Sequence, residues 1–395
     1  NGYNVTQFYC GTFYPEGDDV VAGSQDNGTW SGRNDNASFF KVYGGDGSYC
    51  EIDAAGERLY YSWQNGRLRR RTLSSNANKD LYNALSSALG TTDYWFINPF
   101  TINPNASEQI YYPSKRYIAR SLDAGLTFEK LSNRIVGNAY SIVSTKEDDP
   151  TIFFGGQSGI LYRINNAATA VPGDEFRMST LVPIGVRTGF IGNIEIDPNS
   201  DSTLYLAMTN ISINSNIWRV RNADTDQPIF EDMGANLPES LPVNWVQVDP
   251  LNSDNIIIAT DFGLYTSVNG GGWWEKVEGF PNVPVHMLKM RDHDRTLFIY
   301  THGRGAWVAK LADLVTYTPS IKENKELKIF PNPASDVLKL EMSSGQYSIF
   351  TLNGIEVQKG DLSKSEIRIS SLSSGTYFIK AFGPKGSVSS TFVKR

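Results

Sequence analysis

The stretch NWVQVDPLNSDNIIIATDFGLYTSVNGGGWWEKVEG, residues 244–279, contains four short runs that have the character of β-strands. The runs NWVQV, NIIIAT, GLYTSV and WWEKV are rich in β-branched and aromatic residues, which favour strands. Asp, Pro, Asn and Gly separate the runs, and these residues favour turns. The stretch therefore predicts one four-stranded antiparallel sheet.

The same pattern recurs along most of the chain, as an Asp-Pro or equivalent turn, a short apolar strand and a Gly-containing turn. Pro104, Pro150, Pro198 and Pro250 mark four copies and lie 46, 48 and 52 residues apart. A β-propeller blade repeats every ~40–50 residues. We therefore expect an all-β fold with a propeller of about seven four-stranded blades over residues 1–311. The last copy stops after its third strand, so ring closure requires a strand from the N-terminal segment or from sequence upstream of Asn1.

The composition is that of a globular protein, with 395 residues, 40% hydrophobic and 12% aromatic residues. The net charge of −6 argues against a general phosphate-binding surface, so we expect no nucleic-acid partner. RLRRR at residues 67–71 is predicted to be a solvated strand edge. No run of about 18 apolar residues occurs, so no transmembrane segment is expected. The start at Asn1, without Met, suggests a processed product or a fragment.

Two local features complete the outline of the propeller. The only cysteines, Cys10 and Cys50, fall on neighbouring inner strands of the predicted repeat. One disulfide and two buried thiols both fit this placement. DLYNALSSALG, residues 80–90, predicts a short helix with Asp80 as N-cap and Gly90 at its C-terminal end.

A ten-residue pattern occurs twice, as SLDAGLTFEK at residues 121–130 and SVNGGGWWEK at residues 267–276. Both copies fall between the third and fourth strands of a blade, where an Asp or Asn side chain accepts turn amides and Gly takes a positive φ. The pattern resembles the Asp-box, or BNR repeat, of sialidases, sortilin-type receptors and xyloglucan-active glycoside hydrolases. The resemblance implies a structural role on the face away from the binding site, for the matched residues Ser121, Asp123, Gly125, Thr127 and Phe128, and Ser267, Asn269, Gly271 and Trp274. In the second copy Asn269 replaces the Asp and Trp273 replaces the Thr.

After a linker at residues 312–326, residues 327–395 predict a second domain, a small Ig-like β-sandwich of short alternating strands. The segments IFPNPASDVLKLE, YSIFTLNGIEVQKG, ISSLSSGTYFIKA and the terminal FVKR resemble the C-terminal sorting domain of the type IX secretion system in Bacteroidota. The resemblance implies that the secretion machinery recognises residues 327–395. It also implies export from a Gram-negative bacterium, with attachment to the outer-membrane surface or release.

The turns between second and third strands, and the loops between blades, share one face of a propeller, and their polar residues form a predicted rim. Carboxylates and amides bind sugar hydroxyls and aromatic rings stack on sugar faces, so this rim predicts a site for an extracellular polysaccharide or glycoconjugate. The candidate catalytic acids are Asp26, Asp46 and Asp261, and the candidate binding residues are Gln64, Tyr94, Trp95, Gln157, His302 and Arg304. Lys115, Arg116, Asn210 and Arg187 belong to the same rim. The alternative for each acid is ordinary turn chemistry, because Asp-x-Gly and Asn-Gly are favoured in hairpins.

The chain has three histidines and two cysteines, and their positions match neither a His/Cys metal site nor a Cys-His nucleophile, so no cofactor is expected. NADTDQP, residues 222–228, has spaced oxygen ligands for calcium but lacks the full loop pattern. Three functions stay open: a glycan-binding propeller, a glycoside hydrolase of sialidase or xyloglucanase type, and a building block of a surface assembly. A hydrolase needs two carboxylates ~5–10 Å apart, which the sequence does not establish.

Overall fold

The computed structural model describes residues 5–33, 38–178, 183, 186, 189–209, 215–315, 327–341, 345–352, 355–362, 365–383 and 386–395. The chain divides into two compact units, residues 1–316 and 317–395. No helix within the described ranges has the length and apolar character needed to cross a membrane.

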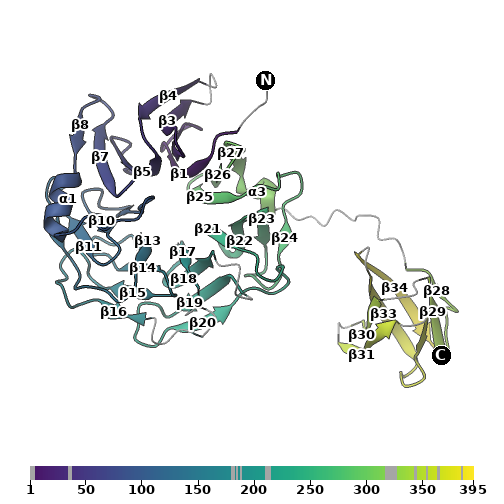
Figure 1. Cartoon of the computed structure of the whole chain (residues 1–395). Helices are drawn as coiled ribbons and strands as arrows, with labels where there is room; N and C mark the ends of the chain where they lie inside the picture. The colour runs from purple at the N-terminus through teal and green to yellow at the C-terminus, as the bar shows by residue number, and fades with distance from the viewer. Residues whose placement is uncertain are drawn as a thin grey trace. The chain divides into compact units, whose positions relative to one another are not determined.

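The first unit is a β-propeller whose sheets stand in a ring around a common centre (Figure 1), and the cavities along this centre are called the central channel below. The first three blades consist of β1 (Phe8–Phe13), β2 (Val20–Ser24), β3 (Gly28–Arg33) and β4 (Ser38–Tyr43); β5 (Gly47–Ile52), β6 (Arg58–Trp63), β7 (Arg67–Thr72) and β8 (Asn78–Asp80); and β9 (Thr101–Ile102), β10 (Ile110–Pro113), β11 (Ile118–Ser121) and β12 (Glu129–Lys130). The next three consist of β13 (Ala139–Ser144), β14 (Ile152–Gly156), β15 (Leu161–Ile164) and β16 (Phe176–Arg177); β17 (Ile191–Asp197), β18 (Ser200–Met208), β19 (Ile217–Arg221) and β20 (Ile229–Asp232); and β21 (Val243–Asp249), β22 (Asn252–Thr260), β23 (Gly263–Ser267) and β24 (Glu275–Lys276). The seventh blade has three described strands, β25 (Val285–Arg291), β26 (Thr296–Thr301) and β27 (Ala306–Lys310). The predicted all-β fold and its propeller are therefore confirmed.

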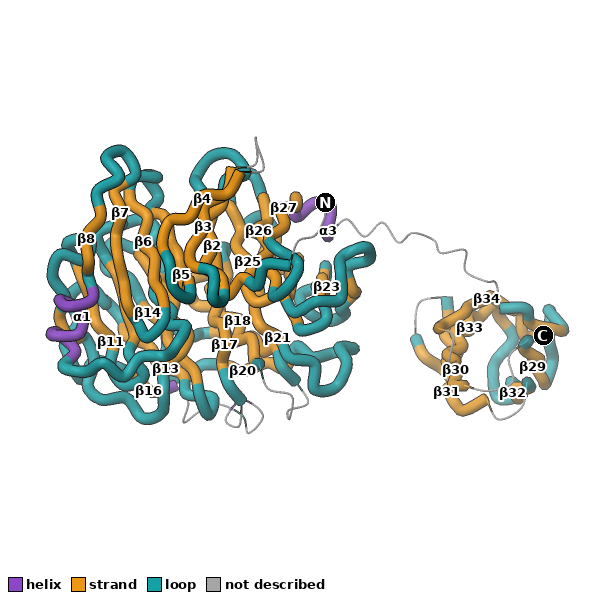
Figure 2. Tube along the Cα trace, turned by 45° about the horizontal axis from the view of Figure 1, so that its top comes forward, coloured by secondary structure: helices purple, strands orange, loops and turns teal. Residues whose placement is uncertain are grey.

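The middle strands of the blades form most of the core. Every residue of β14 and β26 is buried, because each sheet packs between two neighbours and has no solvent face. This packing explains why the sequence of a middle strand, such as IIIAT in β22, is continuously apolar rather than alternating. Loops gather at both ends of the ring, as Figure 2 shows in teal.

Arginines on third strands join neighbouring blades. Arg120 on β11 donates from Nη1 to the carbonyls of Ala167 and Ala170, at 2.7 and 3.0 Å, in the turn of the fourth blade. Arg163 on β15 repeats this contact with the carbonyl of Ala223 in the fifth blade, at 3.0 Å. In the RLRRR strip, which is β7, Arg70 donates to the carbonyl of Ala124 at 2.7 Å. The strip therefore lies on the third strand of its sheet, between β6 and β8, and is not a sheet edge.

The ring closes by packing of the first blade on the seventh. The ring centroids of Phe13 and Phe298 are 4.7 Å apart, and the hydroxyl of Tyr300 donates to the carbonyl of Thr12 at 2.7 Å. Gly11 permits this approach, because a Cβ there would lie 2.2 Å from Tyr300 Cε1. In the described residues the N-terminal segment bonds to the turn after β26, where Gln7 pairs with His302, and adds no strand to β27.

The predicted helix is α1 (Tyr82–Leu89), and a second short helix, α3 (Leu311–Val315), follows β27. Gly90 ends α1 in the left-handed region, as predicted. The prediction of Asp80 as N-cap is wrong, because the N-cap is Leu81. Asp80 Oδ1 still accepts the amide of Tyr82 at 3.1 Å.

Cys10 and Cys50 are free thiols, and both are fully enclosed in the core. The bridge that their placement permits is therefore not formed in the structure. Burial raises the pKa of both thiols. The negative charge of an ionised Cys50 raises the pKa of Cys10 further. They occupy the inner strands β1 and β5 as small apolar side chains.

The second unit contains two sheets around its own core. Their strands are β28 (Ile329–Phe330), β29 (Val337–Leu340) and β32 (Glu366–Arg368) in one, and β31 (Glu356–Leu362), β30 (Gly345–Thr351), β33 (Gly375–Gly383) and β34 (Gly386–Lys394) in the other. Leu338, Ile349, Ile379 and Phe392 lie at the centre of this core.

Candidate functional site

A pocket of about 260 Å³ lies at one end of the central channel. We call this pocket the upper mouth. It lies among the first strands of the blades and the loops that lead into them. The lining residues are Tyr9, Cys10, Tyr49, Ile97, Tyr140, Gly192, Thr209, Asn244, Trp245 and His286. Each blade contributes because its inner strand begins at this end of the channel.

Aromatic rings form two walls of the upper mouth. On one side Tyr9 of β1 stacks on His286 of β25, with 6.3 Å between centroids and 9° between planes. On the other side Tyr140 of β13 packs edge-on against Trp95 and Phe190, at 5.6 and 5.0 Å. These flat apolar surfaces alternate with the polar side chains of Asn244 and Thr209, a combination suited to polyhydroxylated ligands.

The predicted acids Asp26 and Asp46 meet at this end of the ring. The amide of Asp26 donates to Asp46 Oδ1 at 2.7 Å, and the amide of Asp46 donates to Gln64 Oε1 at 2.9 Å. Asp26 is in the β2–β3 turn with a φ of 55°. The structure thus places Asp26, Asp46 and Gln64 in one hydrogen-bonded cluster between the first two blades.

Asp261 lies on the sixth blade, beyond the Tyr9–His286 stack. Its Oδ1 accepts Asn244 Nδ2 at 2.9 Å. Burial and the charges of Asp46 and Asp26 raise the pKa of Tyr9, whereas the charge of Asp261 acts on His286. The acids therefore flank the stack from its two sides, and both Asp46 and Asp261 are engaged as acceptors of structural hydrogen bonds.

The two histidines at the mouth form a neutral pair at pH 7. His286 and His302 are 4.7 Å apart between centroids. Burial, together with the charge of His302, lowers the pKa of His286 to about 4, and burial lowers that of His302. His302 Nδ1 is buried and has no partner among the described residues. The described residues hold no group of three His, Cys, Asp or Glu side chains that could bind a metal ion.

The other predicted binding residues divide between rim and core. Trp95 lies at the rim, where its Nε1 donates to the carbonyl of Ala139 at 2.5 Å. Gln157 is exposed there and accepts Asn138 Nδ2 at 2.7 Å. Tyr94 is placed away from the rim, because it is 6% exposed and its hydroxyl lies 3.3 Å from Ser86 Oγ of α1.

Arg304 is exposed in the β26–β27 turn, and its carbonyl accepts Trp307 Nε1 at 3.0 Å. Lys115 is close to the rim and pairs with Asp93 at 2.9 Å. Arg187 and Asn210 lie outside the described residues.

The sequence reasoning missed the inner-strand residues Tyr9, Tyr140, Asn244, Trp245 and His286. It sought function in turns, whereas these side chains stand near the beginning of first strands. Alignment of the first strands, FYCGTF, AYSIVS, VNWVQVD and VHMLKMR, would have shown aromatic and polar residues near the same end of each.

A second chamber, of about 230 Å³, lies at the opposite end of the channel. Trp245 lines both cavities, and its Nε1 is buried without a partner in the described part of the chain. In this lower chamber Gln247 Nε2 donates to Glu195 Oε1 at 2.6 Å. Burial raises the pKa of Glu195 to about 8; Lys289 opposes the shift and Asp292 adds to it. This carboxyl therefore keeps its proton at pH 7.

The two ten-residue patterns form matching turns, which we call staple turns. In the first, Ser121 Oγ accepts the amide of Gly125 at 2.8 Å, and Asp123 accepts the amide and hydroxyl of Thr127 at 2.9 and 2.6 Å. In the second, Ser267 Oγ accepts the amide of Gly271 at 2.9 Å, and Asn269 Oδ1 accepts that of Trp273 at 2.9 Å. Gly125 and Gly271 both have a φ of 85°.

Phe128 and Trp274 of the staple turns pack inward, whereas Trp273 is exposed. Trp274 is 2% exposed and donates from Nε1 to the carbonyl of Met233 at 2.8 Å, which joins the sixth blade to the fifth. Phe128 packs half-buried against the main core.

The segment with spaced oxygen ligands, residues 222–228, contains Asp226, which pairs with Arg163 at 2.9 Å.

Comparisons with known proteins identify the second unit and the fold of the first. Residues 328–395 match the secretion system C-terminal sorting domain. The match indicates export of the chain and an interaction with the secretion machinery. No curated protein matches the chain.

Among solved structures, a GH74 enzyme of Niastella koreensis is similar with a TM-score of 0.58 and 15% identity, covering 86% of this chain and 58% of that one. The GH74 xyloglucanase from Xanthomonas campestris has a TM-score of 0.58 and 15% identity, with 78% and 52% covered. YCF48 from Cyanidioschyzon merolae has a TM-score of 0.57 and 11% identity, with 77% and 95% covered. At these identities the likeness shows a β-propeller fold, and the chain spans little more than half of each GH74 structure.

Proposed function

We propose that the chain is an exported β-propeller that binds an extracellular glycan at the upper mouth of its channel. The observation that carries the proposal is the pocket itself, whose lining combines Tyr9, Tyr140 and Trp245 with Asn244 and Thr209. Aromatic faces accept the apolar faces of sugar rings, while amide and hydroxyl groups exchange hydrogen bonds with sugar hydroxyls. Residues 327–395 would direct this propeller through the type IX secretion system, which the family match supports.

Binding is favoured over hydrolysis by the state of the predicted acids. Asp46 Oδ1 accepts the Asp26 amide, and Asp261 Oδ1 accepts the Asn244 amide group. Both oxygens are thus engaged in hydrogen bonds within the propeller, whereas a glycosidase needs a pair of carboxyl groups that act on the glycosidic bond. The acids of the mouth therefore support its structure and leave the aromatic and amide side chains to contact a ligand.

The test is a glycan array followed by calorimetry with the full chain and three variants. Tyr9→Ala and Tyr140→Ala should each weaken binding about tenfold, through loss of a stacking surface worth about 1.4 kcal/mol. Trp273→Ala is the matched control, because that side chain is 54% exposed in a staple turn between third and fourth strands. Absence of glycan binding by the wild-type chain, or equal losses in all three variants, would reject the proposal.

A glycoside hydrolase is the second candidate, because the lower chamber holds a carboxyl that stays protonated at pH 7. Glu195 lies there with Asp292, and the pKa of about 8 suits a proton donor. Sugar release from the glycans that bind should be measured for the wild type and for Glu195→Gln, Asp26→Asn, Asp46→Asn and Asp261→Asn. A hydrolase would lose turnover by several orders of magnitude in an acid variant that keeps its fold. A binder would release no product in any of them.

A further inference from the structure

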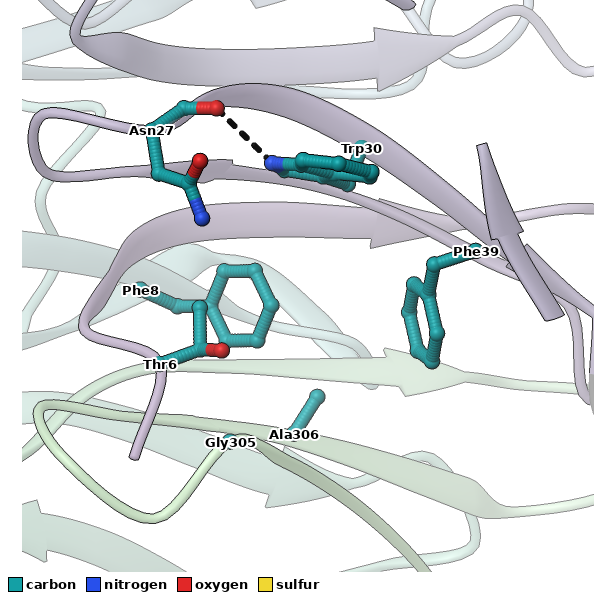
Figure 3. A pocket seen from close by; sticks show the side chains of 7 residues that line it. All are labelled: Thr6, Phe8, Asn27, Trp30, Phe39, Gly305 and Ala306. Carbon is teal, nitrogen blue, oxygen red and sulfur yellow. Dashed lines mark hydrogen bonds between the residues drawn. The ribbon is translucent and has the colours of Figure 1, made fainter. Parts of the chain in front are cut away.

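A third cavity, of about 320 Å³, lies between the first and seventh blades, and we call it the seam groove. Figure 3 shows its walls, with Trp30 and Phe39 on the side of the first blade and Gly305 and Ala306 on the side of the seventh. Phe8, Asn27 and Thr6 complete the lining. The groove is thus mostly apolar, with one amide and one hydroxyl at its edge.

The aromatic side chains of the seam groove are held in place. Trp30 Nε1 donates to the carbonyl of Asn27 at 2.8 Å, which fixes the indole against its own turn. Phe39 lies over Gly32, where a Cβ would be 2.2 Å from Phe39 Cε1. The Phe39 ring is nevertheless 51% exposed. Two oriented aromatic surfaces beside a cavity need little further ordering when a ligand binds.

The seam groove and the upper mouth are neighbours on the same end of the ring. Phe8 lines the groove and the next residue of β1, Tyr9, lines the mouth, at the point where a register shift interrupts the pairing of β1 with β2. Asn27 lines the groove, while the preceding residue, Asp26, bonds to Asp46 near the mouth. Gln7, which pairs with His302, lies between Thr6 and Phe8 of the groove lining.

We infer that a glycan bound at the upper mouth continues over the Asp26–Asn27 turn into the seam groove, where Trp30 and Phe39 stack on a further sugar. The inference rests on the proposed function and specifies its ligand as an oligosaccharide or polysaccharide rather than a single sugar. Charges of both signs lie along this path, because Asp26 and Asp46 are at the turn and Lys41 Nζ is 5.5 Å from the centroid of the Trp30 ring, so uncharged sugars are the appropriate probes. The upper mouth binds one part of the glycan, and the seam groove binds another part.

A polypeptide strand is the competing occupant, because β27 is the last described strand of its sheet and such edges accept strands. The lining argues against it. Of β27 only Ala306 contacts the groove, and the remaining lining comes from turns and aromatic side chains. The backbone edge of β27 therefore does not form the wall to which a strand would bond.

The test measures the affinity of the full chain for uncharged gluco-, xylo- and manno-oligosaccharides separated by length. Trp30→Ala should leave the affinity for the shortest binding sugars unchanged and weaken that for long ones about tenfold. Trp30→Phe should restore most of the loss, which distinguishes stacking from misfolding. Trp273→Ala serves as the control with an exposed tryptophan outside both cavities, and Tyr140→Ala should weaken ligands of every length.

Each outcome bears on one of the two proposals. Wild-type affinity that does not rise with ligand length, or Trp30→Ala losses equal at every length, would overturn the second subsite while leaving the mouth site standing. Binding of an extended apolar peptide that competes with long but not short sugars would give the groove to a polypeptide. A wild-type chain that binds no sugar of any length would remove both proposals.

Discussion

At the scale of single residues, the staple turns show how one side chain organises a loop. Asp123 accepts two hydrogen bonds from Thr127 and one from Ser121 Oγ, at 2.6–2.9 Å. Burial alone would raise the pKa of Asp123, but these hydrogen bonds lower it. The carboxylate therefore stabilises the fold at neutral pH, and this contribution is lost as the pH falls through its lowered pKa.

We expect Asp123→Ala to lower the free energy of unfolding by about 1–2 kcal/mol, the usual loss for a side chain that caps backbone amides. Chemical denaturation at pH 7 measures it. Asn269→Ala is the comparator, because Asn269 supports the second staple turn without a charge and its effect should not depend on acid pH. A loss of glycan affinity with unchanged stability would contradict the structural role of Asp123.

Glu195→Gln should alter how stability depends on pH. Burial raises the pKa of Glu195 in the folded protein to about 8, whereas the ordinary pKa of a glutamate is 4.5. The unfolded chain releases that proton first, so the wild type has its full stability below about pH 4.5 and loses part of it as the pH rises through about 8. The glutamine variant should be more stable than the wild type at pH 9, by roughly 2–4 kcal/mol, and similar to it at pH 4. Melting curves over this range test the sign, and parallel curves for the two proteins would contradict it.

Single residues were predictable from sequence where local chemistry decides their role. Ser121, Asp123 and Gly125 bond within a few residues of one another, so their spacing was sufficient. Tyr94 and the aromatic residues of the mouth were not predictable in this way. Their surroundings come from α1 and from strands of other blades, which a linear pattern does not bring together.

At the scale of elements, the third-strand arginines show how blades are joined to one another. Arg120 is 7% exposed and donates to two turn carbonyls of the next blade. Its pairing with Glu129 fixes the guanidinium. Removal of this side chain would leave buried carbonyls without a donor.

Arg120→Ala should therefore destabilise the propeller by about 2–4 kcal/mol, because two carbonyls in the core would be left without a donor. Amide hydrogen exchange should become faster in the turn at residues 167–170, more than in distant blades. Arg221→Ala is the control, because Arg221 is 51% exposed and its pair with Glu231 should contribute less than 1 kcal/mol. Equal destabilisation by the two variants would refute the account.

Strands and their order were predictable because each blade repeats the same alternation of apolar run and turn. The N-cap of α1 was not, since Leu81 is held there by its burial in the core rather than by a capping side chain. RLRRR was misread as an edge for a related reason. Its arginines find partners on other blades, including Arg70 with Ala124 and Arg69 over the ring of Tyr43.

At the scale of the whole molecule, the two units have separate cores. The core of the second unit consists of residues between Leu327 and Phe392 alone. The assignment of residues 312–326 as a linker, and of the second unit as Ig-like, stays a prediction. The same is true of a role in surface assembly.

Deletion of residues 327–395 should leave a folded propeller that stays inside the cell envelope. The propeller should fold because its core does not use the deleted residues, and export should fail because the sorting domain is gone. Cell fractionation and a melting curve measure the two effects. A chain with an unrelated small domain in place of residues 327–395 controls for length, and normal surface display of either shortened or substituted chain would refute the sorting role.

The closure of the ring has a consequence for the order of events in synthesis. The seam joins Thr12 and Phe13 to Phe298 and Tyr300, so the last contact of the ring forms as soon as the seventh blade has been made. The sorting domain begins only at residue 328. The propeller can therefore close before the signal for its export exists. The secretion machinery would then export the propeller as a folded ring and not as an extended chain.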